Sequence, residues 1–355
     1  MKNMLDIYSD YLLASFSQTT ATGLSILMDG EISHDQVTRF LSSKKKTSKD
    51  LWLVVKPFQR KVNSPDGVLI IDDSIEEKPH TDENDIICWH RDHAKDTYVK
   101  GINFVSLLYH NKDVSLPLGF ELVAKTEEYF DKKSQKMKRR SPITKNEMAR
   151  SMLKQAVKNQ VLFRYVLFDI WFAAKNNLMF IKHDCEKDFI CPIKANRKVA
   201  LSLADKKAGR FQAVSTLEIE SDAELEIYFE GVDFPCKLIK QVFTNEDGSI
   251  GIQYLISSDT TVSRDQMTTI YQKRWNVEVY HKSLKQNVSL ARSPTQTETT
   301  QTNHFFAALC GYIKLEMLKV EQKTNHFAMK TKLYINALKS AFQTLQEMNP
   351  VQFTA

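Results

Sequence analysis

The chain has 355 residues, of which 42% are hydrophobic and 26% are charged. These proportions are typical of a globular protein and exclude the low hydrophobicity of a disordered chain. The length suggests two or three domains. No apolar run approaches the roughly 18 residues that a membrane-spanning helix needs, and the first residues lack the pattern of a signal peptide. We therefore expect a cytoplasmic protein without a membrane partner.

Net charge and cysteine content narrow the possible functions further. The net charge of +6 favours an anionic partner, although many globular proteins carry as much. The cysteines are scattered and odd in number, which argues against a disulfide framework. The segments "CWHRDH" and "HDC" both lack the paired spacing of a zinc knuckle. We expect free thiols at Cys88, Cys185, Cys191, Cys236 and Cys310.

Residues 1–60 predict helices. Ser33 is the expected N-cap of an amphipathic helix, because Val37 and Leu41 follow it on one face. A cluster of lysines at 44–49 comes next. Such a cluster suits contact with DNA phosphates, but a solvated surface turn explains it equally well, so both interpretations stay open.

Three apolar runs then predict strands, at 67–74, 101–110 and 115–123. The first run, "GVLIIDDS", is expected to end at Asp72 or Asp73. Residues 125–141 are highly charged, and we expect them to form an exposed loop.

The next segment predicts a helix, a strand and a second helix. Thr144 and Glu147 have the spacing of a capping box, which predicts a helix through about Asn159. The run "YVLFD" predicts a strand that ends at Asp169, and a helix is expected across 170–180. The order over this part of the chain is three strands, helix, strand, helix.

Residues 183–262 change character. Short alternating runs separated by Asp, Asn or Gly predict an antiparallel β insertion. From Ser263 the chain is expected to be helical again. Apolar faces at 302–319 and 332–345 fit either dimerisation or packing on the core. The chain has no dinucleotide-binding glycine motif, no P-loop and no nucleophile elbow.

The segment "YQKRWNVEVYHKSLK" (271–285) predicts a helix with one polar stripe. At about 100° per residue, its polar side chains fall within an arc of roughly 80°. Apolar side chains fill the adjoining arc, so the helix can pack on a core while the stripe faces a ligand or water. The stripe comprises Tyr271, Arg274, Glu278, His281 and Lys285, and the apolar arc comprises Ile270, Val277, Tyr280 and Leu284.

Three acids are candidates for chemistry. Asp72 and Asp169 each follow a predicted buried strand, and they converge if the two strands are adjacent and parallel. Glu278 lies on the polar stripe. Three ionised carboxylates at one place repel unless a cation neutralises them, and oxygen ligands favour Mg²⁺ or Mn²⁺. Alternatively, Asp169 caps the next helix and Glu278 pairs with Lys282 on a solvated face.

These residues fall into a pattern that resembles a known family. The spacing Y-x2-R-x3-E-x6-K resembles the signature of bacterial DDE transposases of the insertion sequence 4 family. The runs "LIIDDS", "YVLFDIWF" and "CPIKANRK" resemble further blocks of that family, in the same order. The resemblance implies an α/β fold with an RNase H-like mixed-sheet core, a β-rich insertion, and helical N-terminal and C-terminal regions.

The resemblance also implies a division of the chain. It places a helical DNA-binding region first, then a catalytic core interrupted by the β-rich insertion, and last a helical region. The corresponding ranges are 1–60, 61–182 for the first part of the core, 183–262 for the insertion, 263–295 for the last part of the core, and 296–355.

Residue roles follow by position. Asp72, Asp169 and Glu278 would be the catalytic metal ligands, with two Mg²⁺ or Mn²⁺ ions about 3.5 to 4 Å apart. Asp73 is an alternative first ligand, although the Asp-x-Ser spacing favours Asp72.

The remaining signature residues would bind DNA. Tyr271, Arg274 and Lys285 would hold terminal phosphates of the transposon end. Trp275 has two interpretations, of which core packing is favoured over stacking on a displaced base. The resemblance assigns no role to His281.

The implied activity is cut-and-paste transposition, through a DNA hairpin in some members of the family. It further implies terminal inverted repeats and target DNA as partners, a dimer in the synaptic complex, and association with the nucleoid. Two other functions stay open: an RNase H-like nuclease without strand transfer, and a transposase-derived DNA-binding protein without catalysis.

Overall fold

The computed structural model describes residues 3–92, 95–132, 134–220, 222–244 and 247–348. The chain forms two compact units. We call Met1–Val54, Glu76–Gly101 and Tyr280–Ala355 the helical unit, and Val55–Ile75 and Ile102–Val279 the sheet unit. No helix within the described ranges is long and apolar enough to cross a membrane. All five cysteines are buried free thiols, as the sequence predicted.

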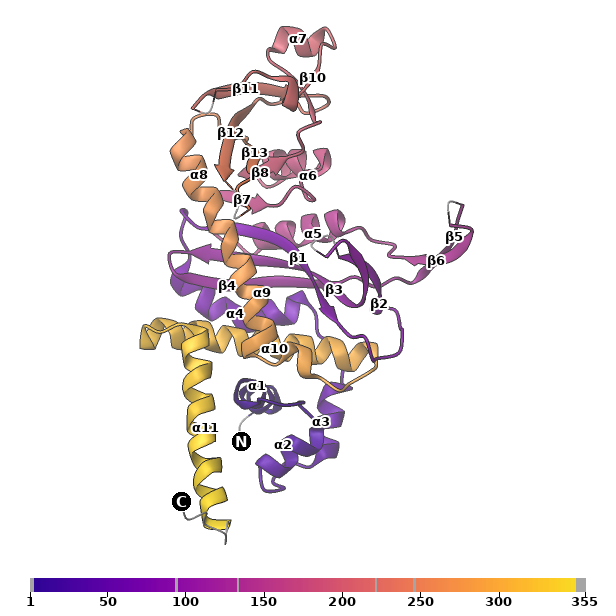
Figure 1. The fold of residues 1–355 in the computed structure, drawn as a ribbon, viewed down its shortest axis with the longest axis vertical. Helices are drawn as coiled ribbons and strands as arrows, with labels where there is room; N and C mark the ends of the chain where they lie inside the picture. The colour runs from indigo at the N-terminus through magenta and orange to yellow at the C-terminus, as the bar shows by residue number, and fades with distance from the viewer. Residues whose placement is uncertain (1–2, 93–94, 133, 221, 245–246, 349–355) are drawn as a thin grey trace. The chain divides into compact units, whose positions relative to one another are not determined.

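A large mixed sheet contains most of the strands of the sheet unit (Figure 1). Its strands run in the order β10-β9-β11-β12-β13-β8-β7-β1-β3-β2, and β4 pairs with β3. The neighbours β1, β7 and β8 are parallel, whereas β3–β4 and the series β8-β13-β12-β11-β9-β10 are antiparallel. The α/β class with a mixed sheet, predicted from the sequence, is confirmed. The bounds are β1 Val68–Glu77, β2 Ile87–Asp92, β3 Thr97–Asn111, β4 Val114–Leu122, β7 Tyr165–Phe168, β8 Asp188–Ile193, β9 Lys198–Ala200, β10 Gln212–Ala213, β11 Glu224–Phe229, β12 Cys236–Thr244 and β13 Ile250–Ser257.

The central strands form because they are apolar on both faces. Residues 68–71 of β1 and all four residues of β7 are buried, as expected for parallel strands covered on both sides. Helix α5 (Lys145–Lys158) begins with the predicted capping box of Thr144 and Glu147, which is confirmed. This helix buries one apolar face, including Met148 and Met152.

The structure corrects four expectations in this part of the chain. β1 continues past both aspartates to Glu77, although its pairing with β7 ends at Ile71. The helix predicted across 170–180 begins only at Lys175, as α6 (Lys175–Met179) followed by a π-helical turn at Phe180–Asp184. Residues 125–141 form a hairpin of β5 (Glu127–Asp131) and β6 (Lys136–Arg140) rather than a loop. Strand β2 was not predicted.

The β-rich segment confirms part of the prediction. Strands β11, β12 and β13 are antiparallel neighbours, as expected. However, β8 pairs with β7 in parallel, so the segment continues the main sheet instead of standing apart from it. One of the short runs predicted as strands, 210–219, forms only β10 and a 3-10 turn at Val214–Thr216. A short helix, α7 (Leu203–Lys207), was not predicted.

Helices make up most of the helical unit, as expected for residues 1–60 and for the C-terminal part of the chain. Ser33 caps α3 with the predicted geometry. The long α10 is buried along most of its length, and the Tyr8 hydroxyl lies 3.0 Å from Nδ1 of His304 on it. The bounds are α1 Met4–Ala14, α2 Ala21–Leu27, α3 His34–Leu41, α10 Glu298–Gln322 and α11 His326–Met348; α4 (Ser48–Val62) begins in this unit and continues into the sheet unit.

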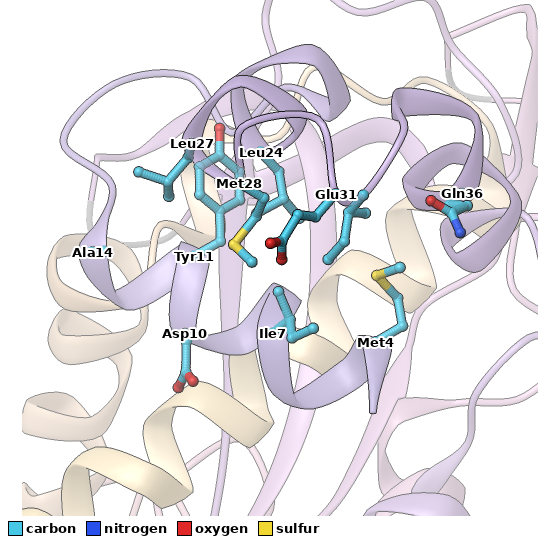
Figure 2. Close-up of a pocket in the computed structure, with 11 residues that line it drawn as sticks. Met4, Ile7, Asp10, Tyr11, Ala14, Leu24, Leu27, Met28, Glu31 and Gln36 are labelled. Carbon is cyan, nitrogen blue, oxygen red and sulfur yellow. The ribbon is translucent and has the colours of Figure 1, made fainter. Parts of the chain in front are cut away.

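Two apolar features of the helical unit remain open to solvent. A cavity of about 610 Å³ is lined by residues of α1, by α2 and by the segment that leads into α3, among them Tyr11, Leu24 and Met28 (Figure 2). Helix α11 buries only His326 and Met329. Its exposed large apolar side chains are Leu333, Tyr334, Ile335, Leu338, Phe342, Leu345 and Met348.

The lysine cluster at 44–49 is partly engaged within the helical unit. Lys45 pairs with Glu298, and Nζ of Lys46 lies 3.6 Å from Oδ1 of Asp50. The backbone of Lys46 donates to the side chain of Asn303 on α10. These contacts fix the course of the chain between α3 and α4.

Candidate active site

Two aspartates follow a matched pair of residues on neighbouring parallel strands. In the register of β1 and β7, Ile71 is paired with Phe168. Asp72 is the next residue of β1, and Asp169 directly follows the end of β7. Strands β1 and β7 are therefore adjacent and parallel, which is the condition under which the sequence predicts that Asp72 and Asp169 converge. Asp72 is only 8% exposed. Its burial and the nearby charge of Asp169 raise the pKa of Asp72 well above its ordinary value.

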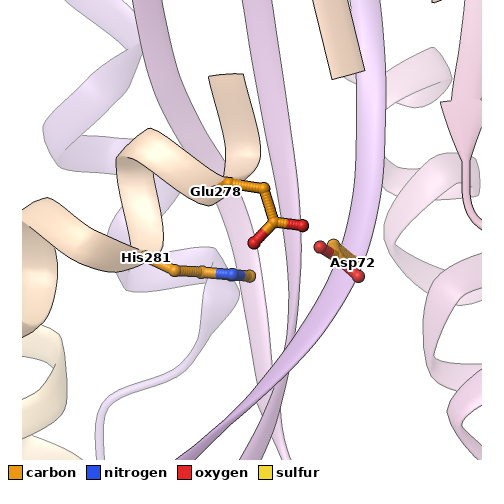
Figure 3. Close-up of side chains that lie close together, drawn as sticks. All are labelled: Asp72, Glu278 and His281. Atoms are coloured by element: carbon orange, nitrogen blue, oxygen red, sulfur yellow. The ribbon is translucent and has the colours of Figure 1, made fainter. Parts of the chain in front are cut away.

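Helix α9 (Asn276–Asn287) brings the third acid to this place. Asp72 and Glu278 each offer a carboxylate oxygen, and these atoms lie within 4.8 Å of each other. The two carboxylates point toward one another (Figure 3). His281, one turn further along α9, presents its ring on the same side of the helix as Glu278 (Figure 3).

One guanidinium lies between the acids. Nη1 of Arg274 is 3.6 Å from Oδ2 of Asp72 and 3.4 Å from Oε1 of Glu278. Its positive charge lowers the pKa of Asp72 and of Asp169, but burial outweighs it in both carboxyls. Glu278 therefore pairs with Arg274, and the pairing with Lys282 that the sequence left open does not appear.

The donor set fits a divalent cation. The carboxylates of Asp72 and Glu278 lie within 3.6 Å of the Arg274 guanidinium, and the charge of Asp169 adds to theirs, so negative charge exceeds positive charge at a partly buried position. Carboxylate oxygens are the ligands that Mg²⁺ and Mn²⁺ prefer, and Asp72, Asp169 and Glu278 are the residues that would hold such ions. A cation here would offset the burial and the repulsion by Asp169 that raise the pKa of Asp72.

The helix that carries the polar stripe is not continuous, which corrects the sequence prediction. α8 (Arg264–Gln272) and α9 are separated by a 3-10 turn at Lys273–Trp275. The Asn276 amide donates to the carbonyl of Lys273 at 2.8 Å and helps to fix this turn. The interruption changes the angular spacing of the stripe, since a 3-10 turn has three residues per turn.

Comparison with known families identifies the chain. The family model described as "DDE superfamily endonuclease" matches residues 1–210, which is more than half of the chain. The chain belongs to the DDE superfamily of endonucleases. A second family model, described as "Transposase DDE domain", matches residues 143–314 of this DDE endonuclease. No curated protein matches it. Members of the superfamily use divalent metals, and transposase-type nuclease activity is the activity of the family.

Asp73, the alternative first ligand, has partners of its own in this DDE endonuclease. Nζ of Lys145, at the start of α5, lies 2.6 Å from Oδ2 of Asp73. The amide of Asn103 on β3 donates to the same oxygen at 3.2 Å. Sequence reasoning missed Lys145 and Asn103, because nothing local in the chain marks either residue.

Asp169 does not cap the next helix, so the alternative interpretation of this residue as an N-cap is wrong. Its Oδ1 accepts the backbone N–H of Trp171 at 3.0 Å and so closes a turn directly after β7. The N-cap residue of α6 is Ala174, which makes no side-chain cap. The turn holds the Asp169 carboxylate at the end of the strand.

The residues predicted to bind DNA lie in different surroundings in this DDE endonuclease. Tyr271 is half-buried beside Arg274, and burial raises the pKa of its phenol. Trp275 is 66% exposed, so the interpretation of this residue as part of the core is wrong. Lys285 belongs to the helical unit, where its charge lowers the pKa of the buried Glu76 against the effect of burial.

Proposed function

We propose that this DDE endonuclease is a transposase of the insertion sequence 4 family that cuts and joins transposon ends. One observation carries the proposal: the carboxylates of Asp72 and Glu278 lie within 4.8 Å of each other while Asp169 follows the neighbouring strand. The family matches and the spacing Y-x2-R-x3-E-x6-K support it.

The three acids take the role of metal ligands in this proposal. Asp72, Asp169 and Glu278 would hold two Mg²⁺ or Mn²⁺ ions. When bound, such ions activate the attacking oxygen of an in-line phosphoryl transfer and stabilise the leaving oxygen. The contacts of Asp73 with Lys145 and Asn103 favour Asp72 as the first ligand, because they occupy the Asp73 carboxylate.

Residues beside the acids would bind the DNA strand. Arg274 is suited to a bidentate contact with a phosphate once cations share the neutralisation of the acids. The neighbouring Tyr271 restricts the orientations of that guanidinium. Lys285 would bind a phosphate of the cut end as a point charge, and its electrostatic interaction with Glu76 would then weaken.

The exposed side chain of Trp275 supports a route through a DNA hairpin. In that route water first cuts one strand, and the new 3′-hydroxyl then attacks the opposite strand and releases the flanking DNA. The resulting tight hairpin displaces a base, and an exposed aromatic ring next to Arg274 is suited to stack on it. Two ends must be joined in one reaction, so we propose a dimer as the active form on DNA.

The proposal retains the division of the chain that the resemblance implies. Residues 1–60 would bind the terminal repeat. The core would comprise 61–182 and 263–295, with 183–262 as the insertion and 296–355 as the C-terminal helical region.

The purified chain should be incubated with Mg²⁺ and the genomic DNA that flanks its coding sequence, and the ends of the products should be mapped. We expect paired cuts at inverted repeats and joining of those ends to a second DNA. Asp72→Asn, Asp169→Asn and Glu278→Gln should each abolish cleavage and spare binding of the ends.

Asp73→Asn is the matched control and should retain cleavage. Cutting without joining would favour the nuclease alternative. If the unaltered chain does not cleave DNA, and Glu278→Gln binds the repeats as well as the unaltered chain does, the DNA-binding alternative without catalysis would be favoured. Full cleavage by any of the three acid variants would remove that residue from the site.

A further inference from the structure

The β5–β6 hairpin extends away from the main sheet of the sheet unit (Figure 1). Each strand has five residues, and none of the described residues in the hairpin is buried. A two-stranded hairpin is marginally stable in water on its own. Here two cross-strand ion pairs support it, Arg140 with Glu127 and Lys138 with Asp131.

One face of this hairpin presents an apolar pair to solvent. Phe130 on β5 and Met137 on β6 face each other in the strand register. Their side chains are 52% and 62% exposed, in a hairpin that has no core to receive them. Arg139 lies on the same face, opposite Glu128. Exposed apolar side chains next to basic ones indicate a binding surface.

The hairpin also concentrates positive charge. Residues 125–141 contain seven Lys or Arg and three Asp or Glu, a net charge of +4 in a chain whose total is +6. Strand β6 alone has the sequence "KMKRR". The favoured partner is therefore polyanionic, because an uncharged protein surface would gain nothing from the positive charge of these residues.

The hairpin arises beside the candidate active site. β6 ends at Arg140, and Lys145, five residues later, contacts Asp73. Asp73 directly follows Asp72 in the chain. A strand of five residues spans about 17 Å, which corresponds to about five base pairs of duplex.

We propose that the β5–β6 hairpin inserts into the major groove of the DNA beside the cleaved phosphodiester and reads its sequence. This inference rests on the proposed function, because it takes duplex DNA as the substrate. The major groove is about 12 Å wide and admits a two-stranded ribbon, whereas the minor groove, at about 6 Å, is too narrow. Phe130 and Met137 contact thymine methyl groups, and the lysines and arginines of β6 contact phosphates.

Binding of the end duplex and of a scrambled duplex should be measured without Mg²⁺, for the unaltered chain and for Phe130→Ser combined with Met137→Ser. We expect the affinity for the end duplex to fall about tenfold, with little change for the scrambled duplex. The matched control is Ile250→Ser combined with Ile252→Ser, an apolar pair on β13 that is 71% and 51% exposed. It should leave both affinities within about twofold.

A second measurement identifies the groups that the hairpin reads. Replacing thymine by uracil at one position at a time removes a single methyl group from the major groove. We expect the unaltered chain to lose affinity at a few neighbouring positions and the Phe130/Met137 variant to lose none there.

The outcomes separate this inference from the proposed function. Equal affinities for the unaltered chain and the hairpin variant, with intact Mg²⁺-dependent cleavage, would overturn the inference alone. A hairpin variant that binds DNA normally but changes its oligomeric state would also overturn it, since the hairpin would then contact protein. Failure of the unaltered chain to bind any duplex would overturn both.

Discussion

The carboxylates of Asp72 and Glu278 offer oxygen atoms within 4.8 Å of each other, although one belongs to β1 and the other to α9. Two like charges at this distance repel, and Asp72 is buried as well. Among the described residues, the guanidinium of Arg274 contacts both carboxylates. The folded protein therefore keeps two repelling carboxylates close together, and a divalent cation would reduce their repulsion.

The first prediction concerns stability in the presence of metal. Mg²⁺ or Mn²⁺ should raise the melting temperature of the unaltered chain, because binding to the folded state alone stabilises it by about 2.7 kcal/mol at one hundred times the dissociation constant. Asp72→Asn should melt higher than the unaltered chain in EDTA, since it removes repulsion, and should respond less to metal. Thermal melts with and without metal test this, with Asp73→Asn as control; an equal metal response in Asp72→Asn would contradict it.

The second prediction concerns the shape of the cation at position 274. Arg274→Lys retains a positive charge but cannot span Asp72 and Glu278 as a planar guanidinium does. We expect the rate of DNA cleavage to fall about a hundredfold, the usual magnitude for loss of a positioned donor. Single-turnover cleavage at saturating protein measures this effect. The control is Lys273→Arg, which makes the reverse exchange at a partly exposed neighbouring position and should leave the rate unchanged. A normal rate in Arg274→Lys would show that charge alone suffices.

The third prediction concerns Lys285 and Glu76 in the helical unit. Burial raises the pKa of Glu76 and the charge of Lys285 opposes that rise, so Lys285→Ala should destabilise the fold as well as weaken binding of the cut end. Adding Glu76→Gln should restore stability but not DNA binding. The coupling energy of such a neighbouring pair is about 0.5 to 3 kcal/mol. Urea unfolding of both single variants and the double variant measures it; additive effects would mean that the two residues do not interact.

The fourth prediction concerns pH. Burial and the nearby Lys78 lower the pKa of His304 to about 4, and the hydroxyl of Tyr8 and the carbonyl of Leu290 contact the two ring nitrogens. The unfolded chain takes up this proton near pH 6.5, so stability is present in full above that pH and falls as the pH drops toward 4. The loss amounts to about 3 kcal/mol.

Urea unfolding between pH 7 and pH 4.5 measures the slope. His304→Gln should flatten it, whereas His34→Gln, at an exposed position, should leave it unchanged. A slope that persists in His304→Gln would assign the proton uptake to other groups.

Some of the site was predictable because its signals are local. The buried runs that end near Asp72 and Asp169 predict strands, and the sequence predicts that the two acids converge if these strands are adjacent and parallel, which they are. Glu278 stood out by its spacing from Tyr271 and Arg274. None of these inferences required knowledge of a contact between distant residues.

The rest depended on tertiary contacts or on signals that other residues obscured. The pairing of Asp73 with Lys145 joins two elements that no sequence pattern links. The charges of 125–141 suggested a loop, because the cross-strand ion pairs that make it a hairpin are visible only in the register. The 3-10 turn at Lys273–Trp275 contains neither glycine nor proline, so the helix break had no local mark.

The central claim, that three acids share a divalent cation site, is tested most directly by local oxidative cleavage of the polypeptide. Fe²⁺ should replace Mg²⁺ in the folded chain, and ascorbate with peroxide should then cut the backbone beside the bound ion. We predict fragments that end near Asp72, Asp169 and Glu278, all suppressed by excess Mg²⁺ and lost in Asp72→Asn. Cuts confined to other segments, or cuts near only one of the three acids, would contradict the account.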